Sequence, residues 1–279
     1  MIDIETIQKD ISGLPPFRHT VLKARQMIND SSVSAEQLTN VLKYDVGITT
    51  NILRCCNSPY YGLRQRVTNL QQAIVLLGYK ELRHLLILSG SMKYFNGSQP
   101  GYESNYGELW QHSITTASLA EIIGNKVGDS DNDLFVTGLM HDVGKLILSR
   151  YVENEYEQIS EMVSSQEVPF HVAENAILGT NHAEVGGRLL SQWNFPETIV
   201  RATANHHEVK SDDNSRVTWI IALADRLASI MGAGTLSDGL TYQDTGKIRD
   251  YFGFSPQEID EIISLGADRV NTITHILAA

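Results

Sequence analysis

The sequence predicts an all-α protein, a compact bundle of roughly a dozen helices with an additional N-terminal helical subdomain. Three observations support this fold class. Apolar residues recur three and four positions apart through most of the chain, which is the spacing of one helix face. No segment shows the alternation of apolar and polar residues that a half-buried strand requires. Residues that typically begin helices recur at short intervals, so the connections are expected to be short.

Residues that begin and end helices define the expected elements of the first half. Ser34 and Gln37 have the spacing of a capping box, in which each side chain bonds the other residue's backbone N–H. Thr68 and Gln71 have the same spacing, and Gly78 is expected to cap the C-terminus of the helix that they begin. The expected helices cover about residues 1–12, 20–29, 35–42, 48–56, 70–77 and 80–94.

Helix-breaking residues separate these segments. Leu14-Pro15-Pro16 imposes extended backbone, and Asp45-Val46-Gly47 is expected to break the chain between two helices. Asn57-Ser58-Pro59 is expected to end the next helix. Asn96–Gly101 has the composition of a linker. We therefore expect an N-terminal helical half, a half that carries the His/Asp cluster, and a C-terminal helical extension, over residues 1–97, 103–232 and 246–279.

The second half continues the helical pattern. In its last expected helix, Ser255 is a capping residue, Pro256 occupies the first helical position and Glu258 the third. The expected helices cover about residues 108–123, 134–140, 146–151, 154–163, 174–178, 182–193, 199–207, 217–231 and 256–265. Loops are expected at residues 129–133, 210–215 and 232–245.

Composition limits the classes of function. The chain has 279 residues, and its 22 Lys and Arg against 33 Asp and Glu give a net charge of -11. This balance argues against a nucleic-acid-binding surface and against a polybasic membrane anchor. The acidic start is no signal peptide, and no apolar run has the length of a membrane span. Cys55 and Cys56 are adjacent on an expected helix, which favours two buried thiols and a cytoplasmic protein.

Histidine and acidic residues of the second half form a candidate metal site. The His141-Asp142 pair ends an apolar run, and imidazole and carboxylate groups hold divalent metals such as Zn, Fe, Mn, Co or Ni. Glu108 and His112 are four positions apart, so they share a helix face. His206 and His207 are adjacent and are expected to point in different directions. The full candidate set is Glu108, His112, His141, Asp142, His182, His206, His207 and Asp225.

The same residues also permit a purely structural role. Asp225 lies in an apolar stretch, where an unpaired carboxylate is costly, and either a metal ion or a cation such as Arg201 or Arg226 would offset this cost. Buried ion-pair networks gather such residues as well. Four further histidines have no acidic company in the sequence and are expected to be surface or ordinary core residues: His19, His84, His171 and His275.

Motifs along the chain carry a family resemblance. The first half contains Leu14-Pro15-Pro16, Asn57–Gly62 and Gln72–Gly78, and the second half contains Leu109–Ser113, Gly138–Lys145, His182–Gly186 and His206–Glu208. In this order, over about residues 13–230, they resemble the HDOD family, a branch of the HD-domain superfamily of metal-dependent phosphohydrolases. Two features depart from the related patterns. Asp45-Val46 stands where the HDOD pattern has Asp-Pro, and no Gly-Tyr-Pro segment follows Glu208, which argues against cyclic dinucleotide hydrolysis.

The resemblance implies an HD-domain-like bundle that holds one or two divalent ions, among which Fe, Mn, Zn and Ni fit equally. It implies metal ligands at the candidate positions, with Glu108 matching a residue that holds an additional metal in HD-GYP phosphodiesterases. Asp142 would bridge the metals, and Lys145 would contact a phosphate. Two functions follow. The first is a bacterial signal-transduction module with a signalling protein or a phosphorylated small ligand as partner. The second is a metal-dependent phosphohydrolase acting on a nucleotide or phosphodiester.

Overall fold

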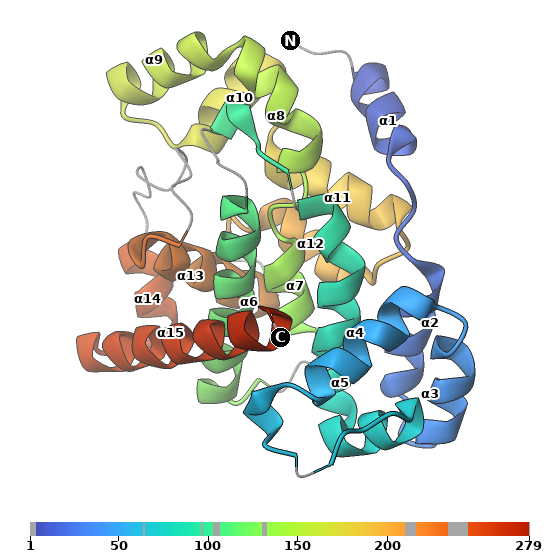
Figure 1. Cartoon of the computed structure of the whole chain (residues 1–279). Coiled ribbons are helices and arrows are strands. Elements are labelled where there is room, and N and C mark those ends of the chain that lie inside the picture. Colours follow the sequence, from blue (N-terminus) through green and yellow to red (C-terminus); the bar gives the residue numbers. More distant parts are fainter. Residues whose placement is uncertain are drawn as a thin grey trace. The chain divides into compact units, whose positions relative to one another are not determined.

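A computed structural model describes residues 4–63, 65–95, 97–102, 107–129, 133–209, 216–233 and 245–278. All regular structure in these residues is helical, without a β-strand, which confirms the predicted all-α class (Figure 1). None of the described helices combines the length and the apolar character needed to cross a membrane. The expected loops at 210–215 and most of those at 129–133 and 232–245 lie outside the described residues.

The chain divides into two compact units. Unit 1 contains residues 1–15 and 94–268, and unit 2 contains residues 16–93 and 269–279. The division falls inside two long helices, after Lys93 and after Asp268. The domain boundaries at 97 and 103 that the sequence suggests stay a prediction.

Unit 2 is built from the first part of the chain and the C-terminal end. Its helices are α2 (His19–Ile28), α3 (Ala35–Leu42), α4 (Val46–Cys56), the 3-10 turn η1 (Pro59–Tyr61), most of α5 (Leu70–Phe95), and the last residues of α15 (Pro256–Ala278). The predicted capping box of Ser34 and Gln37 is present at the start of α3. Gly78 has φ 75° and ψ 166°, so it interrupts α5 at the position where the sequence predicts a helix end.

Two predicted helix starts in unit 2 need correction. Asp45 does not only break the chain, because its carboxylate accepts from the Ile48 N–H at 3.1 Å and caps α4 directly. The predicted Thr68 box is wrong. Asn69 caps α5 instead, accepting from the N–H groups of Gln71 and Gln72 at 2.8 and 3.2 Å. Asparagine is at least as good a cap as threonine, and α5 begins directly after it, at Leu70.

Unit 1 contains the remaining helices: α1 (Ile4–Gly13), the 3-10 turn η2 (Pro100–Tyr102), α6 (Glu108–Lys126), α7 (Leu134–Met140), α8 (Lys145–Asn154), α9 (Tyr156–Gln166), α10 (Phe170–Leu178), α11 (His182–Gln192), α12 (Glu197–Asn205), α13 (Arg216–Ile230), α14 (Thr245–Phe252) and most of α15. The expected linker ends in the packed turn η2. A Cβ on Gly101 would lie 2.2 Å from the Ser149 carbonyl oxygen of α8, so only glycine allows this contact.

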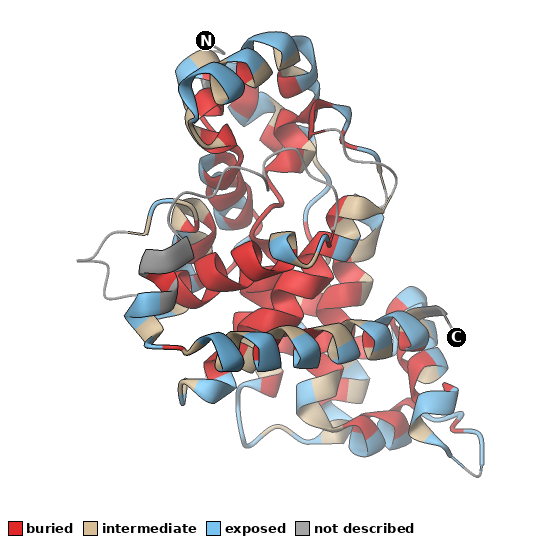
Figure 2. Ribbon diagram, turned by 90° about the vertical axis from the view of Figure 1, so that its left-hand side faces the viewer, coloured by how far each residue is buried: buried red, intermediate tan, exposed pale blue. Residues whose placement is uncertain are grey.

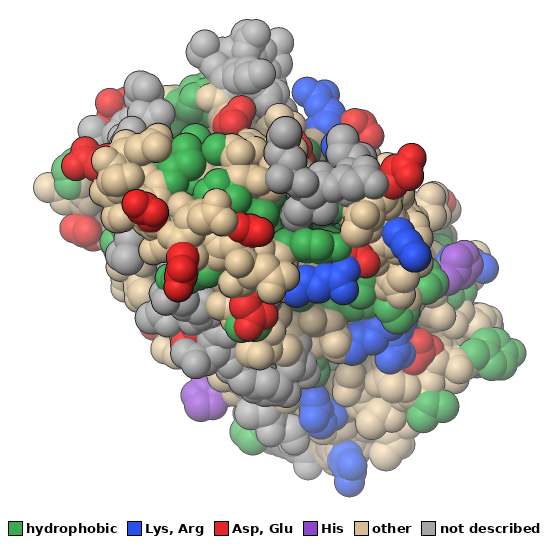
Figure 3. Space-filling model, turned by 90° about the horizontal axis from the view of Figure 1, so that it is seen from above, with side chains coloured by type: hydrophobic (Ala, Val, Ile, Leu, Met, Phe, Trp, Pro, Cys, Tyr) green, Lys and Arg blue, Asp and Glu red, His purple; other side chains and the backbone are tan. Residues whose placement is uncertain are grey.

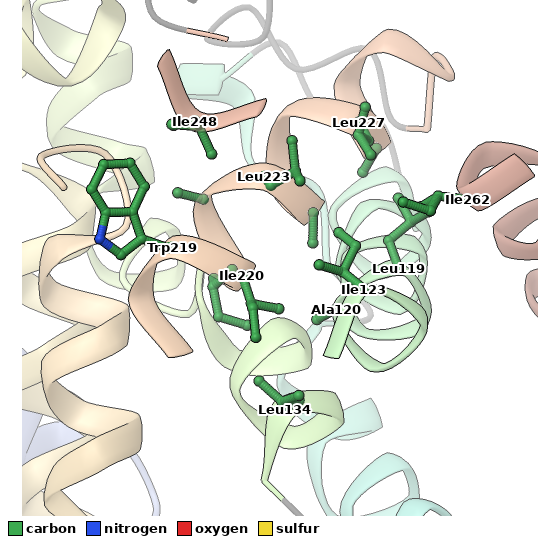
Figure 4. Packing of buried hydrophobic residues seen from close by; sticks show 14 of the residues in the cluster. Leu119, Ala120, Ile123, Leu134, Trp219, Ile220, Leu223, Leu227, Ile248 and Ile262 are labelled. Atoms are coloured by element: carbon green, nitrogen blue, oxygen red, sulfur yellow. The ribbon is translucent and has the colours of Figure 1, made fainter. Parts of the chain in front are cut away.

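The core of unit 1 lies between α6, α7 and α13. All seven residues of α7 are buried, and the helices drawn almost wholly in red in Figure 2 show the same burial. One buried cluster contains Leu223 and Leu227 of α13, Leu119 and Ile123 of α6, and Ile262 of α15 (Figure 4). Burial of each such side chain contributes about 1.5–3 kcal/mol. Helices α6 and α13, which carry His112 and Asp225, and α7, which precedes His141, are therefore held by this core.

Charge on the surface is mixed. Figure 3 shows acidic side chains together with Lys and Arg side chains on one face.

Candidate metal centre

The His141-Asp142 pair occupies the turn between α7 and α8. Because α7 is buried on all sides, the two residues that follow it are carried into the interior, where they are 0% and 1% exposed. Gly144 sits on the His182 carbonyl of α11 so closely that a Cβ there would lie 1.9 Å from that oxygen. The turn is thereby fixed against α11.

Five further ligand side chains reach this turn from other helices. His112 lies in the second turn of α6, His182 is the first residue of α11, His206 and His207 directly follow α12, and Asp225 lies in α13. Their side chains are 0–4% exposed. All seven residues belong to unit 1, so a single compact unit forms the site.

The ligand atoms form three overlapping groups: His112, His141 and Asp142; then Asp142, His182, His206 and His207; and finally His141, His206 and Asp225, which links the other two. The first two groups share Asp142. We call His112, His141, Asp142 and Asp225 site A. The Nε2 atoms of His112 and His141 lie 3.6 and 3.3 Å from Asp142 Oδ2. The same two atoms lie 3.0 and 3.5 Å from Asp225 Oδ1. We call the second group site B: His182, His206 and His207, which lie with Asp142 in one group of ligand atoms within 4.8 Å of one another. Asp142 Oδ1 is 3.5 Å from His182 Nε2 and 3.7 Å from His206 Nε2.

Acceptors behind the rings orient four of the histidines. The Nδ1–H of His112 donates to the Ala233 carbonyl at 3.0 Å. The Nδ1–H of His141 donates to the Gly138 carbonyl at 2.8 Å, and that of His206 donates to the Thr203 carbonyl at 2.6 Å. In His182, Nδ1 donates to Glu174 Oε2 at 2.7 Å. A carbonyl or carboxylate oxygen can only accept, so Nδ1 carries a proton in each of these rings and the opposite nitrogen, Nε2, faces the centre.

The donor set fits a divalent ion. Asp142 Oδ1 and His206 Nε2 are buried and have no hydrogen-bond partner. Leaving such atoms unsatisfied costs roughly 1–3 kcal/mol each, so the fold would not gather them without compensation. A metal ion would satisfy both, and imidazole nitrogen with carboxylate oxygen suits Zn, Fe, Mn, Co or Ni.

Electrostatics in the metal-free centre agree with this geometry. Burial lowers the pKa of His141, but the carboxylates of Asp142 and Asp225 outweigh it and raise the pKa to about 10. Burial raises the pKa of Asp225, but its bonds to His112 and His141 outweigh this and hold the pKa well below its usual range. Burial lowers the pKa of His206 to about 3, so that ring is neutral, the form that binds metal. A proton on His141 thus places positive charge between the two carboxylates.

Comparison with known proteins identifies the family. The model of the HDOD domain matches residues 14–209. The chain belongs to the HDOD domain family. The fold is shared by an HDOD domain protein of unknown function from Geobacter sulfurreducens, at a TM-score of 0.71 and 24% identity over 99% of this chain and 98% of that one. A candidate phosphohydrolase from Shewanella amazonensis also has a TM-score of 0.71, at 18% identity over 96% and 97% of the chains.

Sequence relatives of this HDOD chain are longer than the chain itself. An uncharacterised protein of Treponema pallidum is 22% identical over 206 residues, which are 73% of this chain and 39% of that protein. Ribonuclease Y 1 of Pediococcus pentosaceus is 26% identical over 172 residues, 61% of this chain and 26% of the enzyme. The chain therefore spans well under half the length of these relatives.

The HDOD fold brings together seven of the eight candidate ligands. Glu108 begins α6, is half-buried, and lies outside the groups of ligand atoms found among the described residues. The expectation that His206 and His207 diverge fails, since the side chains of both lie in the group of site B. His206 still has helical backbone angles, φ −66° and ψ −19°, but the two rings lie with centroids 4.0 Å apart and planes inclined by 43°. Lys145 is 1% exposed and its Nζ pairs with Asp142 Oδ2 at 2.6 Å.

Three residues near the centre escaped the sequence reasoning. His171 is not an ordinary core residue, because its ring stacks on His207 with centroids 4.4 Å apart. Glu174 is fully buried and bonds His182, and Tyr102 donates to Glu174 Oε1. His171 and Glu174 are three positions apart and share one face of α10, which was the available signal. Tyr102 had none, because the turn η2 reads as a linker.

Proposed function

We propose that this HDOD module is a regulatory protein of bacterial signal transduction whose buried centre binds two divalent metal ions. The observation that carries the proposal is the position of Asp142, whose Oδ2 faces site A and whose Oδ1 faces site B. One ion would be held by His112, His141, Asp142 and Asp225, and the other by Asp142, His182, His206 and His207.

Burial favours a regulatory over a catalytic role. His141 and His182 are 0% exposed and Asp142 is 1% exposed, whereas a phosphodiester substrate would need access to the ligand atoms. A closed centre suits an ion that stabilises one conformation and so makes association with a signalling protein dependent on metal. The likeness in fold to a candidate signal transduction protein from Marinobacter aquaeolei, at a TM-score of 0.73, is compatible with this role.

A second function is favoured by the bridging carboxylate. Two metal sites that share one carboxylate are the arrangement of many phosphodiester hydrolases, in which the ions act as Lewis acids on a phosphoryl oxygen. Ribonuclease Y 1 among the relatives carries such an activity in its name. In this chain Asp142 would hold the ions and the Lys145 ammonium would neutralise charge on a phosphate or another phosphorylated ligand.

Metal content tests the centre. Untagged protein and Asp142→Ala would be compared by inductively coupled plasma mass spectrometry, with exposed Asp260→Ala as the control. We expect close to two ions per chain in the wild type and the control, and less than one in Asp142→Ala. Absence of metal from all three proteins, also after dialysis against Mn, Fe, Zn or Ni salts, would contradict the proposal.

Partner capture and a substrate screen separate the two functions. Regulation predicts a protein that is retained by the metal-loaded chain and released by a chelator, and no turnover. Hydrolysis predicts turnover of a nucleotide or phosphodiester that Asp142→Ala and Lys145→Met abolish. Turnover that survives in Asp142→Ala would show a contaminating enzyme and would count against the second function.

A further inference from the structure

Five buried side chains form a closed ring of contacts around one side of the centre. His182 Nε2 lies 3.5 Å from Asp142 Oδ1, and His182 Nδ1 donates to Glu174 Oε2 at 2.7 Å. Tyr102 Oη donates to Glu174 Oε1 at 2.5 Å, and the Tyr102 ring faces Lys145 Nζ at 5.3 Å from the centroid. Lys145 Nζ then closes the ring at Asp142 Oδ2, at 2.6 Å.

The two halves of this ring act on different oxygens of Asp142. Glu174 acts through His182 on the side of Oδ1, which belongs to site B. Lys145 acts on Oδ2, which belongs to site A. Tyr102 contacts both halves, through its hydroxyl and through its ring. Tyr102 is 0% exposed and sits at the end of η2, so its position is fixed by packing.

In site B, Glu174 holds the ligand histidine His182 in the orientation that binds a cation. Glu174 accepts both the Nδ1–H and the backbone N–H of His182, so the first residue of α11 is held by two bonds to one carboxylate oxygen. A carboxylate behind a ligand histidine fixes its tautomer and raises its basicity. Site B also has three histidines, and His206 Nε2 and Asp142 Oδ1 are unsatisfied without an ion.

Site A already contains a cation at one of its ligand atoms. An ion bound by His112, His141 and Asp225 would share Asp142 Oδ2 with the Lys145 ammonium. Two cations on one oxygen repel each other, and the repulsion is strong in a buried site because screening by water is weak. Lys145 is 1% exposed, so its charge cannot be solvated where it lies.

We propose that the two metal sites are unequal, that site B fills first, and that Lys145 opposes filling of site A. The HDOD centre then has a stable one-metal form, and a higher metal concentration converts it to the two-metal form. Glu174 and Tyr102 are positioning residues for site B. The inference rests on the proposed metal binding and adds a graded response to metal, which a sensory module requires.

The inference is tested by titrating the metal-stripped full chain with Co²⁺. Calorimetry and visible absorption measure the binding. The wild type should bind in two steps whose dissociation constants differ at least about tenfold. His112→Gln should remove the weaker step, and His206→Gln the tighter one. Glu174→Gln should weaken the tighter step by about 10–100-fold, and Tyr102→Phe should weaken it in the same direction. Glu174→Asp should restore most of the affinity.

Replacing Lys145 should strengthen metal binding, whereas the variants above weaken it. Lys145→Met is close to isosteric, and it should strengthen the weaker step by about tenfold or more while leaving the tighter step nearly unchanged. Lys145→Arg keeps the charge and serves as the matched control, with two separated steps. A merely structural role of Lys145 would weaken both steps in Lys145→Met.

The outcomes distinguish this inference from the proposed function. No binding of Co²⁺ in the wild type overturns both. Two binding steps of equal affinity, or loss of the tighter step in His112→Gln, would overturn the inference but not the proposed metal binding. Neither outcome depends on a Lys145 variant that folds. The inference is supported if the two steps are separated, if His206→Gln removes the tighter step and His112→Gln the weaker one, and if Lys145→Met raises the affinity of the weaker step.

Discussion

The rings of His171 and His207 are stacked, with centroids 4.4 Å apart and planes inclined by 5°. His171 comes from α10 and His207 from the end of α12, so this contact joins two helices at the edge of site B. His171 is 8% exposed, and burial, followed by the charge of His182, lowers its pKa to about 4. The stack thus consists of two neutral rings near neutral pH, since burial also lowers the pKa of His207 well below its usual range.

The stack predicts a loss of stability in acid. Above the unfolded pKa of about 6.5, His171 is neutral in both states and contributes no pH dependence. As the pH falls from about 6.5 to about 4, the unfolded chain takes up the proton first, so folding is penalised increasingly. The shift corresponds to roughly 3 kcal/mol in the free energy of unfolding.

Urea unfolding of the metal-free protein at several pH values would measure this loss. His171→Gln should lose less stability between pH 6.5 and 4 than the wild type, by up to the amount above. Between pH 7 and 8 the two proteins should show parallel behaviour. If the free energy of unfolding fell equally steeply with pH below 6.5 in the wild type and in His171→Gln, this would contradict the assignment to His171.

Local signals predicted most of the helices, because caps and spacing act within a few residues. The Ser34 box and the break at Gly78 are examples, and both are present. The Thr68 box failed because two neighbouring residues could both cap α5, and only the geometry of the chain selects Asn69. Such competition between neighbours is not resolved by spacing.

The candidate site was predictable in its ligands but not in what surrounds them. His, Asp and their order along the chain identify His141 and Asp142. For Glu174 the sequence offers only its spacing from His171, and folding is what places its carboxylate 2.7 Å from His182. Tyr102 lies in a segment of linker composition and becomes buried only because Gly101 lets it approach α8. Contacts between distant segments have no local signature.

The adjacent cysteines should be unreactive in the native protein. Cys55 and Cys56 are free thiols, each 1% exposed, and burial raises the pKa of both. The thiolate is the reactive form, so both access and ionisation oppose modification. We expect slow reaction with a chromogenic disulfide reagent at pH 8 and rapid reaction of two thiols per chain in denaturant. Fast native reaction of either thiol would contradict the buried position.

Metal binding should strengthen as the pH rises. In the metal-free protein the pKa of His141 is raised to about 10, so its Nε2 is protonated near neutral pH and the proton must leave before an ion can bind. Each pH unit between about 6 and 9 should raise the affinity of site A about tenfold, with release of a proton. Calorimetry in two buffers of different ionisation enthalpy would detect that proton. A binding constant independent of pH would contradict protonation at this nitrogen.

Glycine at position 144 should be required for the metal centre. A Cβ there would lie 1.9 Å from the His182 carbonyl oxygen and 2.6 Å from the Gly186 nitrogen, both of which are backbone atoms that cannot turn away. Gly144→Ala should therefore separate α8 from α11, destabilise the protein by about 3 kcal/mol or more, and displace Asp142 from His182. The matched control is Gly47→Ala in α4, where the nearest atom would be 3.4 Å away in the flexible side chain of Arg18. This control should be neutral or slightly stabilising, because alanine favours helix by about 1 kcal/mol over glycine. Thermal unfolding and metal content would be measured for both, and wild-type values in Gly144→Ala would show that α8 does not rest on α11.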